Sequence, residues 1–289
     1  MSTPEEITIE IPTLRLRARA WGPADGVPTL ALHGWLDNAA TFDLIAPRLP
    51  GLRLVCLDLP GHGHSEHAGP GQGYAFIDTV ARIHEATVAL GWNRFCMLGH
   101  SLGAALSSIY AGTFPARVQR LALIEGLGPV TEDPQHAAER LARSLEEEAR
   151  RQGRKPPVYP GVDEAVRRLG ASMSRLSPEA AKVLCERGLK PVEGGGVTWR
   201  SDPRLRIASR LRLTEEQVIV FLKAITCPTF MVRGSEGFPF APKPMSARVS
   251  ALQDSEMVEL TGGHHLHLDT PVEVADALRG FFAPLVQAH

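Results

Sequence analysis

The 289-residue chain lacks long hydrophobic runs and any excess of one charge. No apolar run approaches the roughly 20 residues needed to cross a bilayer, so we expect no membrane-spanning segment. Thirty-one Lys and Arg side chains balance 32 Asp and Glu side chains, which leaves a formal charge of −1. Such a chain offers no positive field for nucleic acid or an anionic membrane surface. The first residues also lack the basic start and apolar stretch of a signal peptide. We therefore expect no nucleic-acid or membrane partner.

Cysteine is scarce as well. The four cysteines, Cys56, Cys96, Cys185 and Cys227, lie far apart and form no Cys-x-x-Cys pair. This spacing argues against a disulfide framework and a zinc ribbon. We expect four buried thiols in a reducing compartment, and hence a cytoplasmic protein.

What the chain does contain is the composition of a globular protein, with 44% hydrophobic and 22% charged residues. Apolar residues alternate along residues 7–11 and again along 14–18, with a Pro12-Thr13 break between them. This pattern predicts a hairpin with one buried face. Short continuous apolar runs follow, and such runs are typical of strands buried on both faces of a parallel sheet. They are residues 29–32, 52–57, 95–98, 121–124, 229–232 and 257–260.

Helical segments lie between these runs. Apolar residues recur at helical spacing over residues 76–90, and residues 102–110 are rich in Ala and Leu. A final helix is predicted to begin with Thr270 as N-cap, Pro271 at its first position and Glu273 completing a capping box. Strand and helix thus alternate, which predicts an α/β fold with a mostly parallel eight-stranded sheet flanked by helices.

The alternation stops between residues 130 and 225. Residues 131–155 carry twelve charged side chains in twenty-five, six of each sign, and several helical pieces follow. We interpret the charged run as a solvated helix face. The pattern predicts a core domain made of residues 1–129 and 226–289, with a helical insertion over residues 130–225.

The most informative motif is Gly99-His100-Ser101-Leu102-Gly103, which follows a predicted strand and opens a predicted helix. This is the setting of a nucleophile elbow, a G-x-S-x-G turn that exposes the serine hydroxyl above the sheet. Small residues two places before and after the serine allow the backbones to approach closely. The free N–H groups of the helix N-terminus point at the same place.

A loop that starts at His33-Gly34-Trp35 follows the strand predicted at residues 29–32. Its Trp35 N–H and the Leu102 N–H are our candidates for an oxyanion hole, in which two donors stabilise a tetrahedral intermediate. We expect the His33 side chain itself to have a structural role.

A base is predicted in Gly262-Gly263-His264-His265-Leu266-His267, which follows the last strand. We choose His264 because it takes the earliest position after the two glycines, with His267 second. These histidines, or alternatively His62, His64 and His67, could form a metal site. Neither set has a carboxylate or thiolate at a diagnostic spacing, so we predict no metal.

The sequence resembles the α/β-hydrolase fold superfamily across essentially its whole length, through HGW at 33–35, LDLPGHGHS at 57–65, GHSLG at 99–103 and GGHHLHLDTP at 262–271. The stretch from Trp199 to Leu205 and the GGHHLH stretch resemble the branch of serine hydrolase-like proteins. The resemblance implies a Ser–acid–His triad in that chain order, a cap domain inserted after the sixth strand, and no cofactor.

The triad acid departs from the commonest family pattern. Many members place an aspartate three residues after the glycine that ends the seventh strand, but here that glycine is Gly234 and the third residue on is Gly237. Glu236 is one place short. Glu125 follows the strand predicted at 121–124, a position that some members use. Because a carboxylate at the end of an apolar strand needs a partner such as a histidine N–H, we favour Glu125, with Glu236 as the alternative.

These residues predict a serine hydrolase, of the carboxylic-ester type, that cleaves a small to medium, mostly apolar ester-like molecule through an acyl-enzyme. Related members also cleave carbon–carbon bonds or carry out perhydrolysis, and a weakly catalytic small-molecule receptor is a further alternative. Epoxide and haloalkane hydrolysis are disfavoured, because those members have a carboxylate nucleophile where this chain has Ser101.

Overall fold

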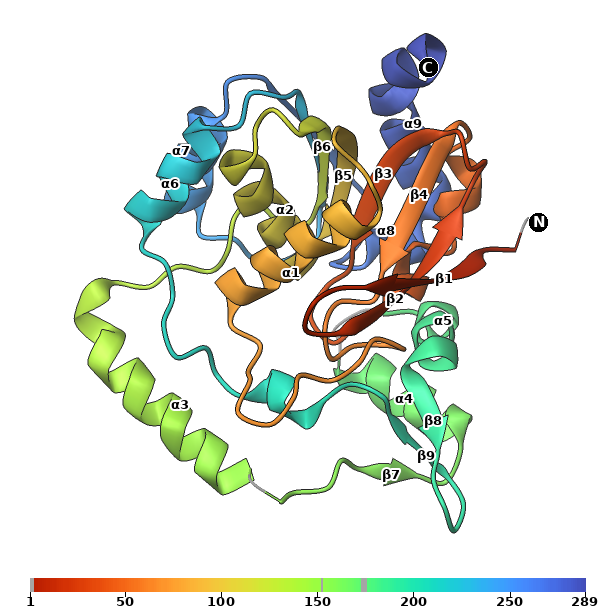
Figure 1. Ribbon diagram of the computed structural model, residues 1–289, viewed down its shortest axis with the longest axis vertical. Coiled ribbons are helices and arrows are strands. Elements are labelled where there is room, and N and C mark those ends of the chain that lie inside the picture. The colour runs from red at the N-terminus through yellow and green to blue at the C-terminus, as the bar shows by residue number, and fades with distance from the viewer. Residues whose placement is uncertain (1–2, 152, 173–175) are drawn as a thin grey trace.

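The computed structural model describes residues 3–151, 153–172 and 176–289 (Figure 1). Its centre is an eight-stranded sheet with the order β1-β2-β4-β3-β5-β6-β10-β11. All neighbouring strands run parallel except β2, which is antiparallel to both β1 and β4. The mostly parallel eight-stranded sheet is therefore confirmed. The strands are β1 (Glu5–Glu10), β2 (Arg15–Trp21), β3 (Val27–Leu32), β4 (Leu52–Leu57), β5 (Phe95–His100), β6 (Val118–Ile124), β10 (Thr229–Gly234) and β11 (Ser255–Leu260).

The N-terminal hairpin forms as the alternating pattern predicts. Ile9 pairs with Leu16, and the Ile11 N–H donates to the Leu14 carbonyl across the break, at 3.0 Å. The continuous apolar runs also behave as predicted in the middle of the sheet, where the residues of β5 are all buried. β11 is different: Met257 is 52% exposed. The expectation of two buried faces is wrong there because β11 is the edge of the sheet.

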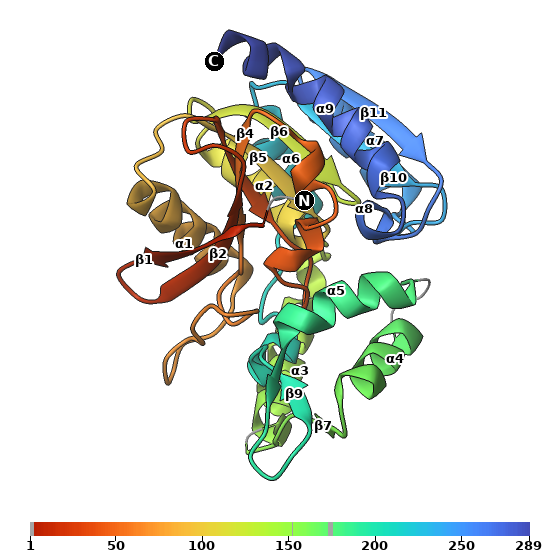
Figure 2. The same cartoon turned by 90° about the vertical axis from the view of Figure 1, so that its right-hand side faces the viewer.

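Helices cover both faces of the sheet and enclose two apolar clusters (Figures 1 and 2). On one face lie α1 (Phe76–Ala89), α2 (Leu102–Thr113), α6 (Glu215–Lys223) and α7 (Pro242–Ala251). On the other face lie η1 (Ala39–Phe42), η2 (Ala46–Arg48), α8 (Leu266–Asp269) and α9 (Pro271–Ala288). Strands buried between these two layers have apolar side chains on both sides, which is why their sequences do not alternate.

The start of α9 differs from the predicted capping box. Pro271 is its first residue, but the Thr270 hydroxyl donates to the Leu266 carbonyl at 3.0 Å and caps nothing. The physical reason is that the short helix α8 ends directly before α9, so the carbonyl of Leu266, four residues before Thr270, accepts from the hydroxyl. The predicted capping box is therefore wrong, although Thr270 is the N-cap residue and Pro271 begins the helix as predicted.

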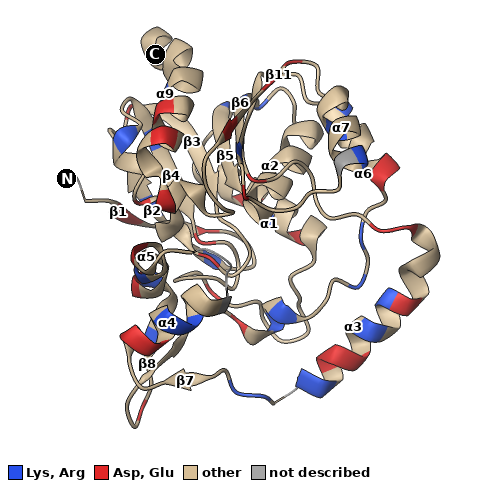
Figure 3. Ribbon diagram, turned by 180° about the vertical axis from the view of Figure 1, so that it is seen from behind, with Lys and Arg blue, Asp and Glu red and all other residues tan. Residues whose placement is uncertain are grey.

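The chain leaves the sheet after β6 and returns at β10, which is the direct neighbour of β6. Between them lie η3 (Pro134–His136), α3 (Ala137–Arg151), β7 (Val158–Tyr159), α4 (Val162–Ser172), α5 (Pro178–Gly188), β8 (Leu189–Pro191), β9 (Val197–Trp199) and η4 (Pro203–Arg206). The three short strands form a separate sheet, β7-β9-β8. Figure 3 shows charges of both signs along α3, where only Arg140 and Ser144 are buried. The charged run is thus a solvated helix, as predicted.

The last helix of the predicted insertion packs with the core. Val218 and Leu222 of α6 are buried in the same apolar cluster as α2. A Cβ at Gly112 of α2 would collide with the Phe221 carbonyl, so the two helix backbones are in close contact. α6 is therefore part of the apolar packing on this face of the sheet, although the sequence pattern placed residues 215–223 in the insertion.

None of the helices in the described part of the chain is long and apolar enough to span a membrane. All four cysteines are buried and unpaired, as the sequence predicts.

Candidate active site

Ser101 lies at the sharp turn between β5 and α2. Its backbone has φ +52° and ψ −111°, a conformation that residues other than glycine rarely adopt. A Cβ at Gly99 would collide with the first turn of α2, and one at Gly103 would overlap the Leu32 carbonyl. The two glycines of the motif are therefore required by contact, and the turn has the strand–turn–helix form that the sequence predicts.

His264 and Glu125 complete a chain of hydrogen bonds that begins at this serine. His264 Nε2 lies 2.9 Å from Ser101 Oγ, and His264 Nδ1 lies 3.0 Å from Glu125 Oε2. The three residues follow β5, β11 and β6, so the carboxyl ends of three strands bring them together. The arrangement has the order and connectivity of a nucleophile, a base and an orienting acid.

Glu125 is held as a buried carboxylate. Its side chain is fully buried, and its oxygens accept hydrogen bonds from the Gly234 N–H at 2.7 Å and the Phe238 N–H at 2.6 Å. Burial acts to raise the pKa of Glu125, but hydrogen bonds from His264, Gly234 and Phe238 outweigh it and leave the pKa below its ordinary value. The group is therefore ionised at neutral pH.

The glycine at the commonest acid position explains how Glu125 fits. A Cβ at Gly237 would overlap both carboxylate oxygens of Glu125. The Glu125 carboxylate thus reaches the space beside the position where many family members have their aspartate. Glu236, the alternative acid, is exposed, and its backbone N–H donates to the Gly262 carbonyl at 2.9 Å. Of the two predicted acids, it is Glu125 whose carboxylate the structure brings to His264 Nδ1.

The loop after β3 lies against the first turn of α2. A Cβ at Gly103 would also approach the His33 carbonyl to 2.9 Å, which shows how closely the loop and the helix meet. Leu102 is the first residue of α2, and a helix leaves its first four N–H groups without helical partners. The His33 side chain is structural, as expected: its Nε2 accepts from the Leu59 N–H at 3.0 Å, and its Nδ1 donates to the Gly34 carbonyl at 2.7 Å.

Two aromatic side chains near the site are exposed. Trp35 is 48% exposed, and its indole N–H donates to the Leu205 carbonyl of the insertion at 3.0 Å. Phe238 is 45% exposed, and its ring centroid lies 5.8 Å from that of His264. The sequence reasoning did not identify Phe238, because nothing in the sequence shows that its N–H binds Glu125.

A buried polar cluster lies directly behind the serine and the histidine. His100 precedes Ser101 and His265 follows His264, and both face the carboxylate of Asp37. His265 Nε2 is 3.3 Å from Asp37 Oδ2, and His100 Nδ1 is 3.4 Å from the same oxygen. His100 Nε2 donates to the His264 carbonyl at 2.8 Å. The cluster thus joins the turn at Ser101, the loop after β11 that carries His264, and the loop after β3. The sequence did not reveal this role of Asp37.

The charges in this cluster follow from burial. Burial lowers the pKa of His100 to about 4, so this ring is neutral at pH 7. Burial acts to raise the pKa of Asp37, but His265 and His100 hold it well below its ordinary value. Burial likewise acts against protonation of His265, but Asp37 outweighs it and raises the pKa of His265.

The two sets of histidines that we considered as possible metal ligands, and did not predict as a metal site, make other contacts. His264 contacts Ser101, and His267, our second choice of base, instead contacts the Thr41 hydroxyl through Nε2 at 2.7 Å. His62 contacts the Pro60 carbonyl and His67 the Arg200 carbonyl. Within the described ranges, the possible metal ligands that converge are instead Asp37, His100 and His265, whose ligand atoms all lie within 4.8 Å of one another.

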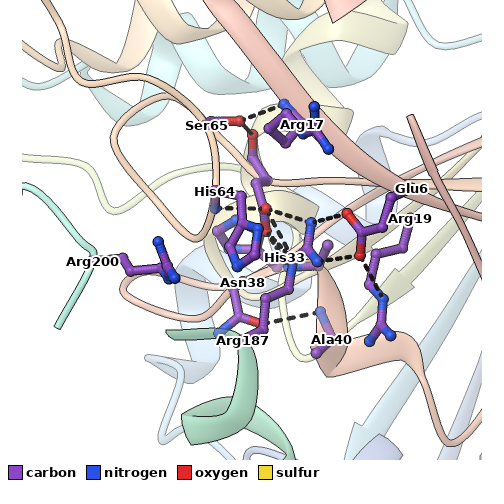
Figure 4. Close-up of polar contacts among 12 residues, drawn as sticks. Glu6, Arg17, Arg19, His33, Asn38, Ala40, His64, Ser65, Arg187 and Arg200 are labelled. Atoms are coloured by element: carbon purple, nitrogen blue, oxygen red, sulfur yellow. Dashed lines mark hydrogen bonds and ion pairs between the residues drawn. The ribbon is translucent and has the colours of Figure 1, made fainter. Parts of the chain in front are cut away.

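A buried ion network ties the insertion to the core (Figure 4). Arg187 of α5 contacts Asp58 at 2.8 Å and Glu6 of β1 at 2.6 Å. Asp58 also accepts from the Ala39 N–H at 2.7 Å and the His64 N–H at 2.9 Å. The contact with Ala39 joins the loop after β4 to η1, and the contact with His64 lies within that loop.

The segment from Trp199 to Leu205 is fastened to the loop before α1. Asp202 accepts from the Tyr74 hydroxyl at 2.7 Å, and the Asp202 N–H donates to the Gly61 carbonyl at 2.8 Å. Arg204 in turn contacts Asp202 and the Ala68 carbonyl. These contacts hold the segment between β9 and Leu205, whose carbonyl accepts from the Trp35 indole.

The class of protein follows from this fold, this site and one comparison. A family model described as the alpha/beta hydrolase fold matches residues 28–271. The chain therefore belongs to the α/β-hydrolase fold family, and its closely similar curated relatives put it in the serine hydrolase-like branch.

Two of these relatives span nearly the whole chain. A "Probable serine hydrolase" of Drosophila melanogaster is 34% identical over 285 residues, which cover 94% of this chain and 85% of the relative. A "Serine hydrolase-like protein" of Danio rerio is 30% identical over 290 residues, which cover 96% of this chain and 88% of the relative.

Two solved structures are similar to this chain over nearly its whole length. A hypothetical protein from Pseudomonas aeruginosa PAO1 is 42% identical, with a TM-score of 0.92 and coverage of 96% of this chain and 99% of that one. A thioesterase domain from the curacin biosynthetic pathway is 28% identical, with a TM-score of 0.85 and coverage of 95% and 99%.

Proposed function

We propose that the protein is a serine hydrolase that cleaves carboxylic esters or related acyl compounds through a covalent acyl-enzyme. The observation that carries this proposal is the unbroken chain of hydrogen bonds from Ser101 through His264 to Glu125. In such a chain the imidazole accepts the serine proton as the hydroxyl attacks, and the carboxylate holds the imidazole in the right tautomer.

In the proposed acylation, His264 Nε2 takes the proton from Ser101 Oγ, and the oxygen attacks the carbonyl carbon of the substrate. The negative charge that develops on the carbonyl oxygen is stabilised by the N–H groups of Leu102 and Trp35. Leu102 is suited to this role because it opens α2, where unpaired N–H groups and the helix dipole favour an anion. The imidazolium then gives its proton to the leaving alcohol.

In the proposed deacylation, His264 takes a proton from a water molecule, which attacks the acyl-enzyme carbonyl. Collapse of the second tetrahedral intermediate releases the acid and returns the proton to Ser101. Glu125 stabilises the imidazolium that forms in both steps. Its lowered pKa supports this role, since the group stays ionised at the pH of the reaction.

The substrate that we propose is small to medium in size and mostly apolar. The exposed rings of Trp35 and Phe238 support an apolar acyl or alcohol group, since Phe238 is close to His264 and Trp35 belongs to the oxyanion loop. The structural likeness to a thioesterase domain adds thioesters to the compounds to be tested.

We further propose that residues 130 to about 214 act as a lid over this site. The contact between the Trp35 indole and the Leu205 carbonyl supports this role, because it joins the insertion to the oxyanion loop. We also propose a cytoplasmic protein with a small-molecule substrate and no nucleic-acid or membrane partner. The four unpaired cysteines and the balanced net charge support these assignments.

The direct test is turnover of short p-nitrophenyl esters, thioesters, lactones and a diketone by wild type and by Ser101→Ala. We expect wild type to hydrolyse at least one acyl compound and Ser101→Ala to lose roughly 10³-fold or more in kcat. Equal rates for the two proteins would contradict the role of Ser101. Turnover of the diketone alone would move the activity to carbon–carbon bond cleavage.

A further inference from the structure

The buried cluster behind the catalytic residues has an unusual arrangement of lone pairs. His100 Nε2 contacts the His264 carbonyl at 2.8 Å, and a carbonyl oxygen can only accept, so Nε2 carries the proton. In the neutral ring the other nitrogen, Nδ1, then carries a lone pair. This lone pair faces Asp37 Oδ2, a second acceptor, at 3.4 Å. Among the described residues, no donor reaches His100 Nδ1, which is completely buried.

A carboxylate at position 37 is not the side chain that would best satisfy the hydrogen bonds of this cluster. An asparagine at position 37 could donate its amide N–H to His100 Nδ1 and still accept from His265, so every group would be satisfied. A carboxylate instead leaves two acceptors facing each other in a buried place, where an unpaired polar atom is costly. A cation held by both acceptors removes this conflict.

The three side chains converge closely enough to hold one metal ion, because their ligand atoms all lie within 4.8 Å of one another. His265 Nε2 lies 3.4 and 3.3 Å from the two Asp37 oxygens, and His100 Nδ1 lies 3.4 Å from one of them. Ligands about 2.0–2.1 Å from a tetrahedral zinc ion are separated by roughly 3.3 Å. Two imidazoles and one carboxylate are also a donor set that Zn²⁺ accepts.

At Gly34 the loop after β3 has no side chain beside Asp37 Oδ2 and His100 Nδ1. A Cβ at Gly34 would lie 2.8 Å from Asp37 Oδ2 and 2.9 Å from His100 Nδ1. A methyl group at this position would press on both ligand atoms, whereas glycine keeps the space between them free.

We propose that Asp37, His100 and His265 form an inhibitory binding site for a transition-metal ion, with Zn²⁺ as the best-fitting member of the class. Asp37 supplies a carboxylate oxygen, His100 supplies Nδ1 and His265 supplies Nε2. Where His265 carries a proton on Nε2, the ion displaces it into solvent.

The effect on catalysis follows from position, and this half of the inference rests on the proposed function. The His100 and His265 ring centroids lie 4.9 and 5.3 Å from that of His264. The proposed mechanism requires His264 to become an imidazolium. A divalent cation held by the two neighbouring rings opposes this positive charge, so the ion slows acylation without occupying the site of Ser101.

The test uses untagged, chelator-treated full-length protein and ZnCl₂. We expect elemental analysis after dialysis against micromolar Zn²⁺ to find one ion per chain. Ester turnover by the loaded protein should fall at least tenfold and recover with EDTA. Because stoichiometry is measured without substrate, its result stands even if no ester is turned over. Less than stoichiometric zinc on the wild type would overturn the proposal.

Three variants locate the ion. Asp37→Asn keeps the shape of the side chain and should lose the zinc. His264→Gln should keep it, which distinguishes this site from zinc bound by the proposed base. His136→Gln, at an exposed histidine near Glu139, should behave like wild type in both binding and inhibition. Loss of zinc from His264→Gln, or its retention by Asp37→Asn, would contradict the assignment.

Should Asp37→Asn fail to fold, a crystal of the wild type soaked with Zn²⁺ can locate the ion directly. Anomalous scattering at the zinc edge is expected within bonding distance of Asp37, His100 and His265. A peak on His264 or on the surface alone would overturn the proposal.

Discussion

Two residues of the proposed triad have strained backbones. Ser101 has φ +52° and Glu125 has φ +54°, and each such residue costs on the order of 1–3 kcal/mol unless its surroundings hold it. Here the Ser101 N–H donates to the Ile124 carbonyl and the Glu125 N–H to the Val232 carbonyl, both at 2.9 Å. The neighbouring strands thus hold both residues at the carboxyl edge of the sheet.

The choice of acid can be tested by removing its charge. Glu125→Gln keeps the side-chain length, but it cannot hold the imidazolium of His264. We expect kcat for an ester to fall by roughly 10³–10⁴. Glu236→Gln is the matched control and should change kcat little. The reverse order would assign the acid to Glu236.

Moving the acid is a stronger version of the same test. A Cβ at Gly237 would overlap the Glu125 carboxylate, so an aspartate at 237 needs a smaller residue at 125. We expect Glu125→Ala to be nearly inactive, and the double variant Glu125→Ala, Gly237→Asp to recover part of the lost kcat. No recovery in a folded double variant would contradict the view that both positions reach the same nitrogen of His264.

The packing of α2 on β3 depends on one glycine. A side chain at position 103 would overlap the Leu32 carbonyl, and neither backbone can move without displacing the elbow. Gly103→Ala should therefore lower the free energy of unfolding by at least about 3 kcal/mol.

Gly280 of α9 is the matched control, because a Cβ there meets nothing within 4 Å. Gly280→Ala should raise the free energy of unfolding by up to about 1 kcal/mol. Urea denaturation measures both variants. Similar stability changes in the two would contradict the close contact at residue 103.

The insertion is anchored by a buried charge. Arg187 is 6% exposed, and its loss would leave Asp58, which is fully buried, without its cation. We expect Arg187→Ala to lower the free energy of unfolding by about 3–5 kcal/mol. Arg167→Ala removes an exposed ion pair of α4 and should cost less than about 1 kcal/mol.

Limited proteolysis adds a readout for the insertion itself. If α5 holds the insertion on the core, Arg187→Ala should be cleaved within residues 130–214 faster than wild type. Unchanged cleavage, together with unchanged urea stability, would contradict an anchoring role for this ion pair.

At the scale of the whole molecule, buried neutral histidines make stability depend on pH. Burial lowers the pKa of His33, and it lowers the pKa of His62 to about 3, from an ordinary 6.5. Below pH 6.5 the unfolded chain binds protons that the folded chain does not, so stability is lost as pH falls. We expect the free energy of unfolding to decrease from pH 7 to pH 5, by up to ~1.4 kcal/mol per pH unit for each such group.

The variant His62→Gln cannot titrate at this position. Its urea stability should therefore decrease less steeply between pH 7 and pH 5 than that of wild type. An equal slope in the two proteins would show that His62 titrates alike in the folded and unfolded chains.

Local patterns were sufficient to predict most of the fold and part of the site. Continuous apolar runs predicted the buried strands, and the glycine spacing around Ser101 predicted the elbow. What the sequence could not reveal depends on contacts between distant residues. Asp37 meets His265 across 228 positions, and Arg187 meets Asp58 across 129. The place of α6 in the core likewise depends on contact with α2, which no pattern within residues 215–223 indicates.

The central claim is that Ser101 is an activated nucleophile, and covalent labelling tests it most directly. A fluorophosphonate reacts with a serine whose hydroxyl is deprotonated by a neighbouring base. We expect one label per wild-type chain, located on Ser101 by peptide mass spectrometry, and almost none on Ser101→Ala or His264→Gln. No labelling of the folded wild type, or equal labelling of the His264→Gln variant, would contradict the account.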